Sequence, residues 1–387
     1  MRLNPVLDEL GSYPSADVRR RAAEREAAGL RVIDFSIGDP LEPTPTFIAD
    51  ALRNGVPAVS QYPTAEGEPH LRSAIADYLE RRHGTVINPD TQIIPTSGSK
   101  EAIFSSHFAF VDRMAGDVVA FPSPGYPVYE RGARFAGANV HRLVLHDDFV
   151  LRSDMISDSV LERAHMLWIC TPHNPSGAVM TRDDLARIYE RCRRSSTLLL
   201  SDECYADTFE DDIYPEGPSS VLQVADGVAG VLAFFSLSKR SGMTGYRSGA
   251  IVGDESAIAS LKMLRATTGT APSSFVQAAA TAAWSDDTHA AERRAVFTEK
   301  RRILASAFST LGLEVVASQA GLYLWVNVGD DLKVTNQLLA EGIVVSPGRY
   351  FGEGGEGYIR LALVPHLEEC TAAADALVRA IGAETET

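Results

Sequence analysis

The segment Ser236–Gly249, SLSKRSGMTGYRSG, contains the most informative group of polar side chains in this 387-residue sequence. Two hydroxyls, an amine and a guanidinium lie within twelve positions, at Ser236, Ser238, Lys239 and Arg247. Hydroxyl and guanidinium groups bind phosphate, and a nearby amine becomes a nucleophile when it is partly deprotonated. The segment therefore predicts a phosphate site beside a Schiff-base lysine, although a solvated polar loop would have the same composition.

A carboxylate and two further polar side chains follow other apolar runs. Asp202 follows Leu198–Ser201 in the segment SDECY, and Tyr205 lies three residues farther on. A buried carboxylate can pair with a protonated ring nitrogen, which makes the ring a better electron sink. Asn174, in the segment TPHNPSGAVMT after Met166–Cys170, can donate to a phenolate-type oxygen. A helix or turn cap at Asp202 and a simple turn at Asn174 are the structural alternatives.

A fourth segment, PTSGSKEAI at Pro95–Ile103, combines small residues with a helix start near Ser99. Free N–H groups at the start of a helix bind phosphate well. Serine with a nearby glutamate is also a capping signal, so an ordinary capped helix is the alternative. Each of the four segments is a weak signal alone. All four follow strand-like runs, however, and ligands collect at the carboxyl ends of strands in α/β sheets.

Short apolar runs alternating with helical patterns predict the sheet that would position these segments. Helices are expected at Ser99–Val111 and at Thr181–Arg194, the second with Thr181 as N-cap. Strands separated by helices predict a mostly parallel sheet covered on both faces. The expected strands are Ile93–Pro95, Val118–Phe121, Val140–Leu145, Met166–Cys170, Leu198–Ser201, Val231–Phe235 and Gly249–Val252.

The carboxy-terminal part of the sequence has a different pattern. A long helical stretch covers about Thr288–Leu311, and a closing helix covers His366–Ile381. This arrangement of strands and separate helices predicts a smaller α+β domain. No low-complexity linker marks where that domain begins. Between the two helices, short strands are expected at Glu314–Val316, Leu322–Val326, Ile343–Val345 and Tyr358–Leu363.

The composition narrows the class of protein. A formal net charge of −15 argues against nucleic acid or an anionic membrane as partner, because phosphate binding needs a basic face. None of the four cysteines forms a Cys-x-x-Cys motif, so no metal site is predicted. The amino terminus lacks the apolar stretch of a secretory signal, and no apolar run reaches the roughly 18 residues of a membrane span. We therefore expect a soluble cytoplasmic protein.

From about Ile33 to its carboxyl terminus, the sequence resembles the class I/II aminotransferases, the pyridoxal-phosphate (PLP) enzymes of fold type I. The resemblance rests on NPSG at Asn174–Gly177, SDECY, SLSKRSGMTGYRSG and the spacing of 37 positions between Asp202 and Lys239. YPTAEGEPHLRSAI from Tyr62, PSPGYPVY from Pro122 and YIRLAL from Tyr358 extend it.

This resemblance implies an α/β fold of two domains and a homodimer with active sites at the subunit interface. Residues 1–45 would form an amino-terminal arm and part of the small domain. Residues 46–285 would form the large PLP-binding domain, with a mostly parallel sheet flanked by helices. Residues 286–387 would form the small α+β domain.

The resemblance also implies roles for individual residues. Lys239 would hold PLP as a Schiff base and later move a proton, while Asp202 would pair with the pyridine nitrogen. Asn174 and Tyr205 would bind the phenolic oxygen, and Tyr126 would stack on the ring. The phosphate would be held by the backbone amides of Ser99 and Lys100, the side chains of Ser236, Ser238 and Arg247, and Tyr62 of the neighbouring subunit.

The same resemblance implies how an amino acid and a 2-oxo acid would bind. Arg360 would grip the substrate α-carboxylate in a bidentate fork, and the backbone at Gly38 would close over it. Lys100 would bind a distal carboxylate, as in glutamate or 2-oxoglutarate, if it is not simply a surface lysine.

Several stretches are most similar to the N-succinyldiaminopimelate aminotransferases of bacterial lysine synthesis. They include AGLYLWVNV from Ala320, where Tyr323 and Trp325 are expected to be strand core, and VVSPGRYFGEGGEGYIRLALV from Val344. Arg349 in the second stretch would meet a succinyl carboxylate. An aspartate- or alanine-type aminotransferase and a C–S β-lyase remain alternatives, as does a non-catalytic regulator, against which the intact Lys239 and Asp202 argue.

Overall fold

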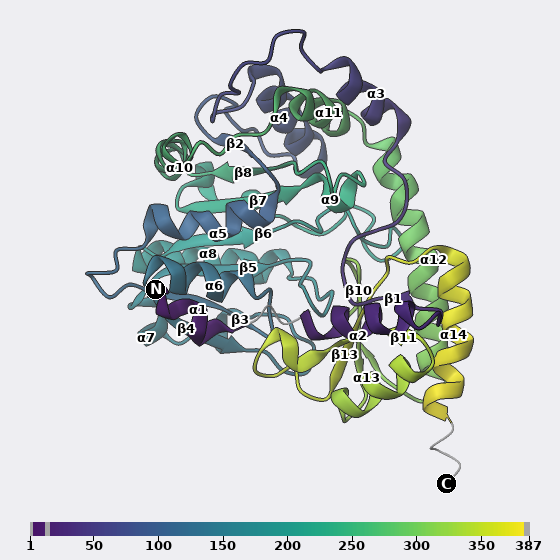
Figure 1. Cartoon of the computed structure of the whole chain (residues 1–387). Helices are drawn as coiled ribbons and strands as arrows, with labels where there is room; N and C mark the ends of the chain where they lie inside the picture. The colour runs from purple at the N-terminus through teal and green to yellow at the C-terminus, as the bar shows by residue number, and fades with distance from the viewer. Residues whose placement is uncertain (1–2, 12–15, 383–387) are drawn as a thin grey trace.

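The computed structural model describes residues 3–11 and 16–382, and its largest feature is a seven-stranded sheet (Figure 1). The strands lie in the order β2-β8-β7-β6-β5-β3-β4, and β8 runs antiparallel to both of its neighbours while the other pairs are parallel. The strands are β2 (Ile93–Thr96), β3 (Val118–Ser123), β4 (Asn139–Val144), β5 (Ala164–Cys170), β6 (Leu198–Asp202), β7 (Val231–Ser236) and β8 (Gly249–Gly253). The mostly parallel sheet predicted from the sequence is confirmed.

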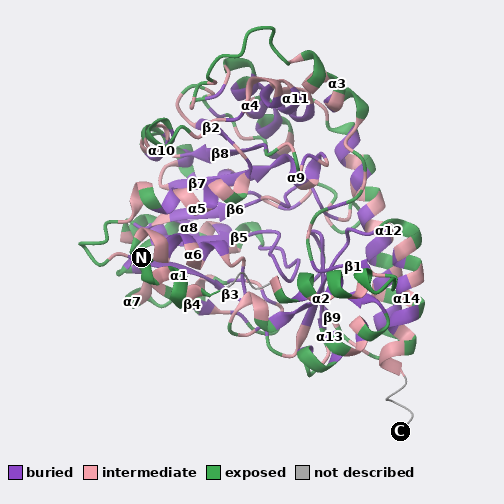
Figure 2. Cartoon of the chain, in the orientation of Figure 1, coloured by how far each residue is buried: buried purple, intermediate pink, exposed green. Residues whose placement is uncertain are grey.

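Helices cover both faces of this sheet, and alternate strand residues enter two separate cores. On β5, Met166 and Trp168 pack in one core, and Leu167 and Ile169 pack in the other. Apart from the edge strand β4, Figure 2 shows the strands as almost entirely buried, which explains why their sequences are continuous apolar runs. Helices α5 (Ser99–Phe110), α6 (Val128–Ala136) and α10 (Glu255–Thr268) line the first core, and α4 (Pro69–His83), α8 (Arg182–Ser195) and α11 (Ser274–Trp284) line the second.

The carboxy-terminal unit is built on a four-stranded antiparallel sheet in the order β12-β13-β10-β9. Its core is apolar and includes Phe297 and Leu304 of α12, Leu324 of the sheet and Cys370 of α14. The elements are α12 (Thr288–Thr310), β9 (Val315–Val316), β10 (Tyr323–Asn327), α13 (Asp331–Ala340), β12 (Ser346–Pro347), β13 (Tyr358–Ala362) and α14 (Leu367–Gly382). This is the smaller α+β unit that the sequence predicts.

The amino-terminal segment belongs in part to the carboxy-terminal unit. Strand β1 (Ile33–Asp34) pairs in parallel with β11 (Ile343–Val344), and α2 (Ala16–Ala27) packs through Val18 and Ala22 against Val344. Helix α3 (Thr46–Asn54) instead packs against α11 beside the large sheet. The predicted domain borders at residues 45 and 285 fall between these groups of elements and stay a prediction. Three short helices complete the fold: α1 (Pro5–Leu10), α7 (Asp158–Leu161) and α9 (Leu237–Arg240).

Two kinds of feature are not found in the described ranges 3–11 and 16–382. None of the helices there combines the length and the apolar character needed to cross a bilayer. Histidine, cysteine, aspartate and glutamate side chains do not gather there in a group of three or more that would hold a metal ion.

Candidate active site

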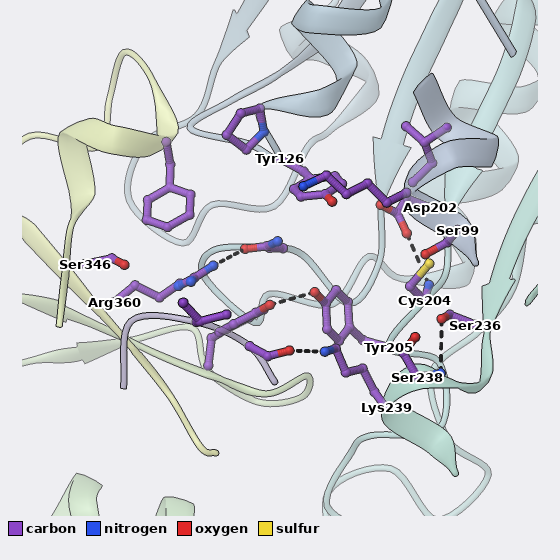
Figure 3. Close-up of a pocket in the computed structure, with 18 of the residues that line it drawn as sticks. Ser99, Tyr126, Asp202, Cys204, Tyr205, Ser236, Ser238, Lys239, Ser346 and Arg360 are labelled. Carbon is purple, nitrogen blue, oxygen red and sulfur yellow. Dashed lines mark hydrogen bonds between the residues drawn. The ribbon is translucent and has the colours of Figure 1, made fainter. Parts of the chain in front are cut away.

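A cavity of about 390 Å³ lies where the carboxyl ends of the parallel strands face the carboxy-terminal unit (Figure 3). Ligand pockets commonly have volumes of roughly 300–1,000 Å³, so this one has room for a small ligand. The sequence predicted twelve residues that line it: Gly38, Ser99, Lys100, Tyr126, Asn174, Asp202, Tyr205, Ser236, Ser238, Lys239, Arg247 and Arg360.

Lys239 projects into this cavity from helix α9, which starts directly after β7. Its Nζ donates a hydrogen bond to the carbonyl oxygen of Gly38, which follows β1 and lies beside Tyr323. Burial lowers the pKa of Lys239 to about 8, and the nearby carboxylate of Asp39 opposes this shift only in part. More of this amine is therefore neutral near pH 7 than in an ordinary lysine, and a neutral amine can attack a carbonyl carbon.

Arg240, the next residue, fixes the backbone of helix α9. Its Nε donates to Oδ2 of Asp207 at 2.7 Å, and its guanidinium lies 4.9 Å from the centre of the Tyr78 ring. Both partners of the ion pair are almost fully buried. Because a buried pair is costly to break, it restricts the position from which Lys239 reaches the cavity.

Asp202 is the last residue of strand β6. Among the described residues, no other acidic side chain lines the cavity. Its Oδ1 accepts the backbone N–H of Cys204 at 3.2 Å, and its Oδ2 accepts the hydroxyl of Tyr129 at 2.7 Å. Burial raises the pKa of this carboxyl, and the two donors oppose that shift. A cation placed opposite the carboxylate would compensate the burial, as a protonated ring nitrogen does.

Behind Asp202, Tyr129 is held by a chain of buried rings. Its ring stacks on Trp168 with centroids 5.0 Å apart and an angle of 18° between planes. The indole Nε1 of Trp168 donates to Nε2 of His107 at 3.1 Å. Burial lowers the pKa of His107 to about 4, so its ring is neutral and Nε2 can accept this bond. The orientation of the Asp202 carboxylate thus depends on three residues from α6, β5 and α5.

On the same side of the cavity as Asp202, the start of helix α5 forms an anion cradle. Helix α5 begins at Ser99, and its N-cap Gly98 has no side chain to occupy the first N–H groups. A Cβ at Gly98 would collide with the guanidinium of Arg247, so the glycine lets this cation approach the helix start. Ser236 and Ser238 line the same cavity. Helix N–H groups, hydroxyls and a guanidinium together are what a phosphate group requires.

Arg360 of β13 forms the wall that belongs to the carboxy-terminal unit. Its Nη1 donates to Oδ1 of Asn174 at 2.9 Å, and its Nη2 donates to the carbonyl oxygen of Ser36 at 2.7 Å. The guanidinium lies between the rings of Tyr323 and Phe351, 4.3 and 4.4 Å from their centres. Its Nε is buried without a hydrogen-bond partner among the described residues. This group is therefore ready to bind a carboxylate.

These three features fit a phosphorylated pyridine aldehyde such as PLP. The cradle would hold its phosphate, the carboxylate of Asp202 would pair with the ring nitrogen, and Lys239 would supply an amine for the aldehyde. Tyr126 lines the same cavity and offers an aromatic ring beside them. When bound, PLP supplies a ring that delocalises the electrons left when an amino acid loses its α-proton.

The model of the aminotransferase class I and II family matches residues 31–377. The chain belongs to the class I and II aminotransferases. It is therefore a PLP-dependent transaminase of fold type I, whose substrates are small molecules, an amino acid and a 2-oxo acid.

Individual members of the family resemble this aminotransferase over nearly its whole length. An LL-diaminopimelate aminotransferase 2 from a Nostoc species is 35% identical over 373 residues, 94% of each chain. The crystal structure of an aminotransferase from Neisseria meningitidis has a TM-score of 0.90 and 31% identity, covering 97% of this chain and 99% of that one. A probable N-succinyldiaminopimelate aminotransferase from Thermus thermophilus has a TM-score of 0.87 and 27% identity, covering 94% and 99%.

Two residues proposed from the sequence lie outside the cavity. Arg349 does not line it, and its Nη2 binds Oδ1 of the buried Asp331 at 2.6 Å, so its expected contact with a succinyl carboxylate stays a prediction. An acidic residue at the start of α13 takes up the guanidinium, which a loop sequence alone does not reveal. Tyr62 is fully exposed on the segment between α3 and α4. Its expected role concerns a neighbouring subunit and stays a prediction.

Sequence reasoning missed several residues of the aminotransferase site. Tyr129 falls three positions after Tyr126, in the first turn of the helix that follows β3, and this spacing was a usable signal. Tyr323 was expected to be only strand core, yet it also lines the cavity. No sequence feature indicated Arg19 of α2 as a site residue, because nothing in its local sequence shows that the amino-terminal helix lies at the cavity. Ser36, Cys204 and Ser346 also line it.

Proposed function

We propose that this transaminase takes LL-diaminopimelate as its amino donor and a 2-oxo acid as acceptor, with glutamate and 2-oxoglutarate as one pair. Both the Nostoc relative and a second relative from Aquifex aeolicus, 33% identical over 378 residues, are LL-diaminopimelate aminotransferases by name, which supports the donor. The sequence favoured the N-succinyl form of the same diamino acid, and these relatives carry the unmodified form in their names.

The observation that carries the proposal is the distribution of cations along the cavity. Arg360 lies on one wall, where it would hold the α-carboxylate. Arg19 of α2 and Lys100 of α5 also line the cavity, and neither is required by the cofactor's ring or aldehyde. A donor with a carboxylate at each end would use both groups of cations, whereas alanine would use only Arg360.

A second candidate donor is N-succinyl-LL-diaminopimelate, and one observation favours it. Free diaminopimelate carries a second ammonium group at its distal end. Asp202 is the one acidic side chain among the described residues that line the cavity, and its carboxylate is already assigned to the ring nitrogen in this proposal. A distal ammonium would then need a carboxylate from elsewhere, for example from a neighbouring subunit. The succinylated form carries an uncharged amide at that place and needs none.

In this proposal each residue of the site has a defined task. The amine of Lys239 binds the aldehyde and, once released, moves a proton at the substrate α-carbon. Asp202 keeps the ring nitrogen protonated, and Asn174 and Tyr205 bind the phenolic oxygen. Arg360 binds the α-carboxylate and thereby orients the bond to the α-proton, while the Gly38 segment closes over it.

We also propose that the enzyme works as a homodimer in which Tyr62 reaches the phosphate of the other subunit. Val56, Val59 and Tyr62 lie on the segment between α3 and α4, and all three are more than half exposed. In Figure 1 this segment forms a loop at the edge of the molecule. Several exposed large apolar and aromatic residues on one loop are typical of a surface that is covered in an assembly. Light scattering after size exclusion measures the mass, and a monomer that retains full activity would overturn this part.

The donor is tested by a panel of amino acids added to the holoenzyme with 2-oxoglutarate. We expect kcat/KM for LL-diaminopimelate to exceed that for alanine and aspartate at least about tenfold, the effect of one charge-assisted contact. A higher value for the succinylated form would favour the second candidate. Highest activity with alanine or aspartate would overturn both, and pyruvate release from cystathionine without added keto acid would mark a β-lyase.

Arg19→Ala sharpens this test, because it should lower kcat/KM for diaminopimelate and leave alanine unchanged. Arg20→Ala is a matched control, since Arg20 lies next to it on α2 and pairs with Asp17 and Glu24 on the surface. An equal decrease in kcat/KM for both donors in Arg19→Ala would show that Arg19 does not bind the distal carboxylate.

A further inference from the structure

Two buried phenols meet inside the cavity, although they come from distant parts of the chain. Tyr205 follows β6, and Tyr323 is the first residue of β10. Their hydroxyl oxygens lie 2.6 Å apart, and their rings meet edge to face with centroids 5.4 Å apart. Figure 3 shows Tyr205 with its hydroxyl directed toward the carboxy-terminal unit. The pair therefore bridges the two walls of the site.

The position of Tyr323 is fixed by its neighbours. Its ring lies 4.3 Å from the guanidinium of Arg360, and the side chain is 3% exposed. Gly38 leaves space for its hydroxyl, because a Cβ there would come within 2.7 Å of Tyr323 Oη. A ring held on one side by a cation and at its tip by a glycine has little freedom to turn its hydroxyl away from Tyr205.

Each phenol carries one proton, and this limits how the pair can bond. Burial raises the pKa of both tyrosines, so both keep their protons at neutral pH. In the proposed function, Tyr205 donates its proton to the phenolic oxygen of the cofactor. Its own oxygen can then only accept, which leaves Tyr323 as the donor within the pair.

We propose that Tyr323 is a positioning residue, whose hydroxyl donates to Tyr205 and thereby makes Tyr205 a stronger donor to the cofactor's phenolic oxygen. Consecutive hydrogen bonds polarise one another, so the second bond in such a chain is strengthened. The inference rests on the proposed role of Tyr205 and does not depend on which amino acid is the substrate. It also connects the Arg360 wall to the cofactor, because the same ring supports the guanidinium.

The test compares Tyr323→Phe with Tyr205→Phe and with the double variant. The readout is the pH midpoint of the visible absorbance change of the holoenzyme, together with the Kd for PLP. Loss of a donor leaves more negative charge on the phenolic oxygen. Because this charge stabilises the protonated form of the chromophore, the chromophore loses its proton only at higher pH. We expect Tyr205→Phe to raise the midpoint and Tyr323→Phe to raise it by a smaller amount. The Kd for PLP should rise about two- to tenfold in Tyr323→Phe, the range for one buried hydrogen bond.

The double variant separates a relay from two independent effects. If Tyr323 acts through Tyr205, then Tyr323→Phe shifts nothing further once Tyr205 is Phe. A full additional shift in that background overturns the proposal, as does an unchanged midpoint in the single variant with only a lower Tm. If Tyr205→Phe itself leaves the midpoint unchanged, the proposed role of Tyr205 is the part that fails. Tyr214→Phe is a matched control, since it loses a surface hydroxyl that donates to Gln319.

Discussion

The two walls of the active site are built in different ways. On the wall formed by the large sheet, Asp202 is the last residue of β6, and Lys239 and Asn174 lie three and four residues after the ends of β7 and β5. Their neighbours in sequence complete each local motif. On the opposite wall, Arg360 is oriented by Asn174, 186 positions away, and by Ser36, 324 positions away. The first wall is therefore a set of local motifs aligned by one sheet. The second is assembled from segments with no local relationship.

This difference predicts that the walls fail separately. Changes on the sheet wall should weaken cofactor retention, whereas a change of Arg360 itself should weaken substrate binding and leave the cofactor in place. Lys239 belongs to both, because its amine starts on the sheet wall and its Nζ contacts Gly38 on the other.

Lys239→Ala should have the largest effect, since it removes the nucleophile and the proton carrier together. We expect turnover to fall at least about 10⁴-fold, the upper end for a positioned acid–base group, and the visible absorbance of the lysine-bound cofactor to disappear. Steady-state kinetics and an absorbance spectrum measure both. Lys262→Ala is the matched control, because Lys262 pairs with Glu66 outside the cavity. Full turnover in Lys239→Ala would show that Lys239 is not the Schiff-base lysine.

Arg360→Lys tests the substrate wall alone. Lysine keeps the charge but loses the two-pronged fork and the planar group between Tyr323 and Phe351. We expect kcat/KM to fall about 10- to 100-fold, as for one lost charge-assisted contact, mainly through KM. The Kd for PLP, measured by equilibrium dialysis, should not change. A weaker Kd with an unchanged KM would mean that the two walls do not act separately.

Tyr129→Phe is the corresponding change on the sheet wall. The Tyr129 hydroxyl lowers the pKa of Asp202, opposing the effect of burial. Without it the carboxyl pKa rises further, so less of the carboxylate is ionised to pair with the ring nitrogen. We expect the Kd for PLP to rise about tenfold, the effect of one hydrogen bond to a charged group. An increase in KM alone would contradict this assignment.

Arg349→Ala should have the smallest effect on activity. Because its guanidinium binds Asp331, we expect kcat/KM for N-succinyl-diaminopimelate and for diaminopimelate to equal the wild-type values. The variant should instead melt at a lower temperature, since the buried Asp331 loses its cation. Thermal unfolding and kinetics on the same preparation measure the two effects. A selective loss with the succinylated donor would instead support the substrate role that the sequence suggested.

The elements of the large sheet could be predicted from the sequence to within two residues. Both faces of β5, β6 and β7 are buried, so each strand is a continuous apolar run that ends where a polar segment begins. The strands of the carboxy-terminal unit were harder to predict. The two-residue strands β9 and β11 fall within expected strands, but β1 and β12, which are equally short, were not expected. Neither length nor periodicity identifies these two, and β1 pairs with a strand about 310 positions away.

The sequence by itself determined the reactive groups of the sheet wall. Lys239, Asp202, Asn174 and the serines around Lys239 belong to local motifs, and a parallel sheet necessarily brings the ends of its strands together. Only the tertiary structure decided what surrounds them. It placed Arg19 at the cavity, bound Arg349 to Asp331 and brought the hydroxyl of Tyr323 to Tyr205. These contacts depend on how the carboxy-terminal unit packs across the sheet. Because the residues that meet there are far apart in sequence, no local sequence pattern predicts that packing.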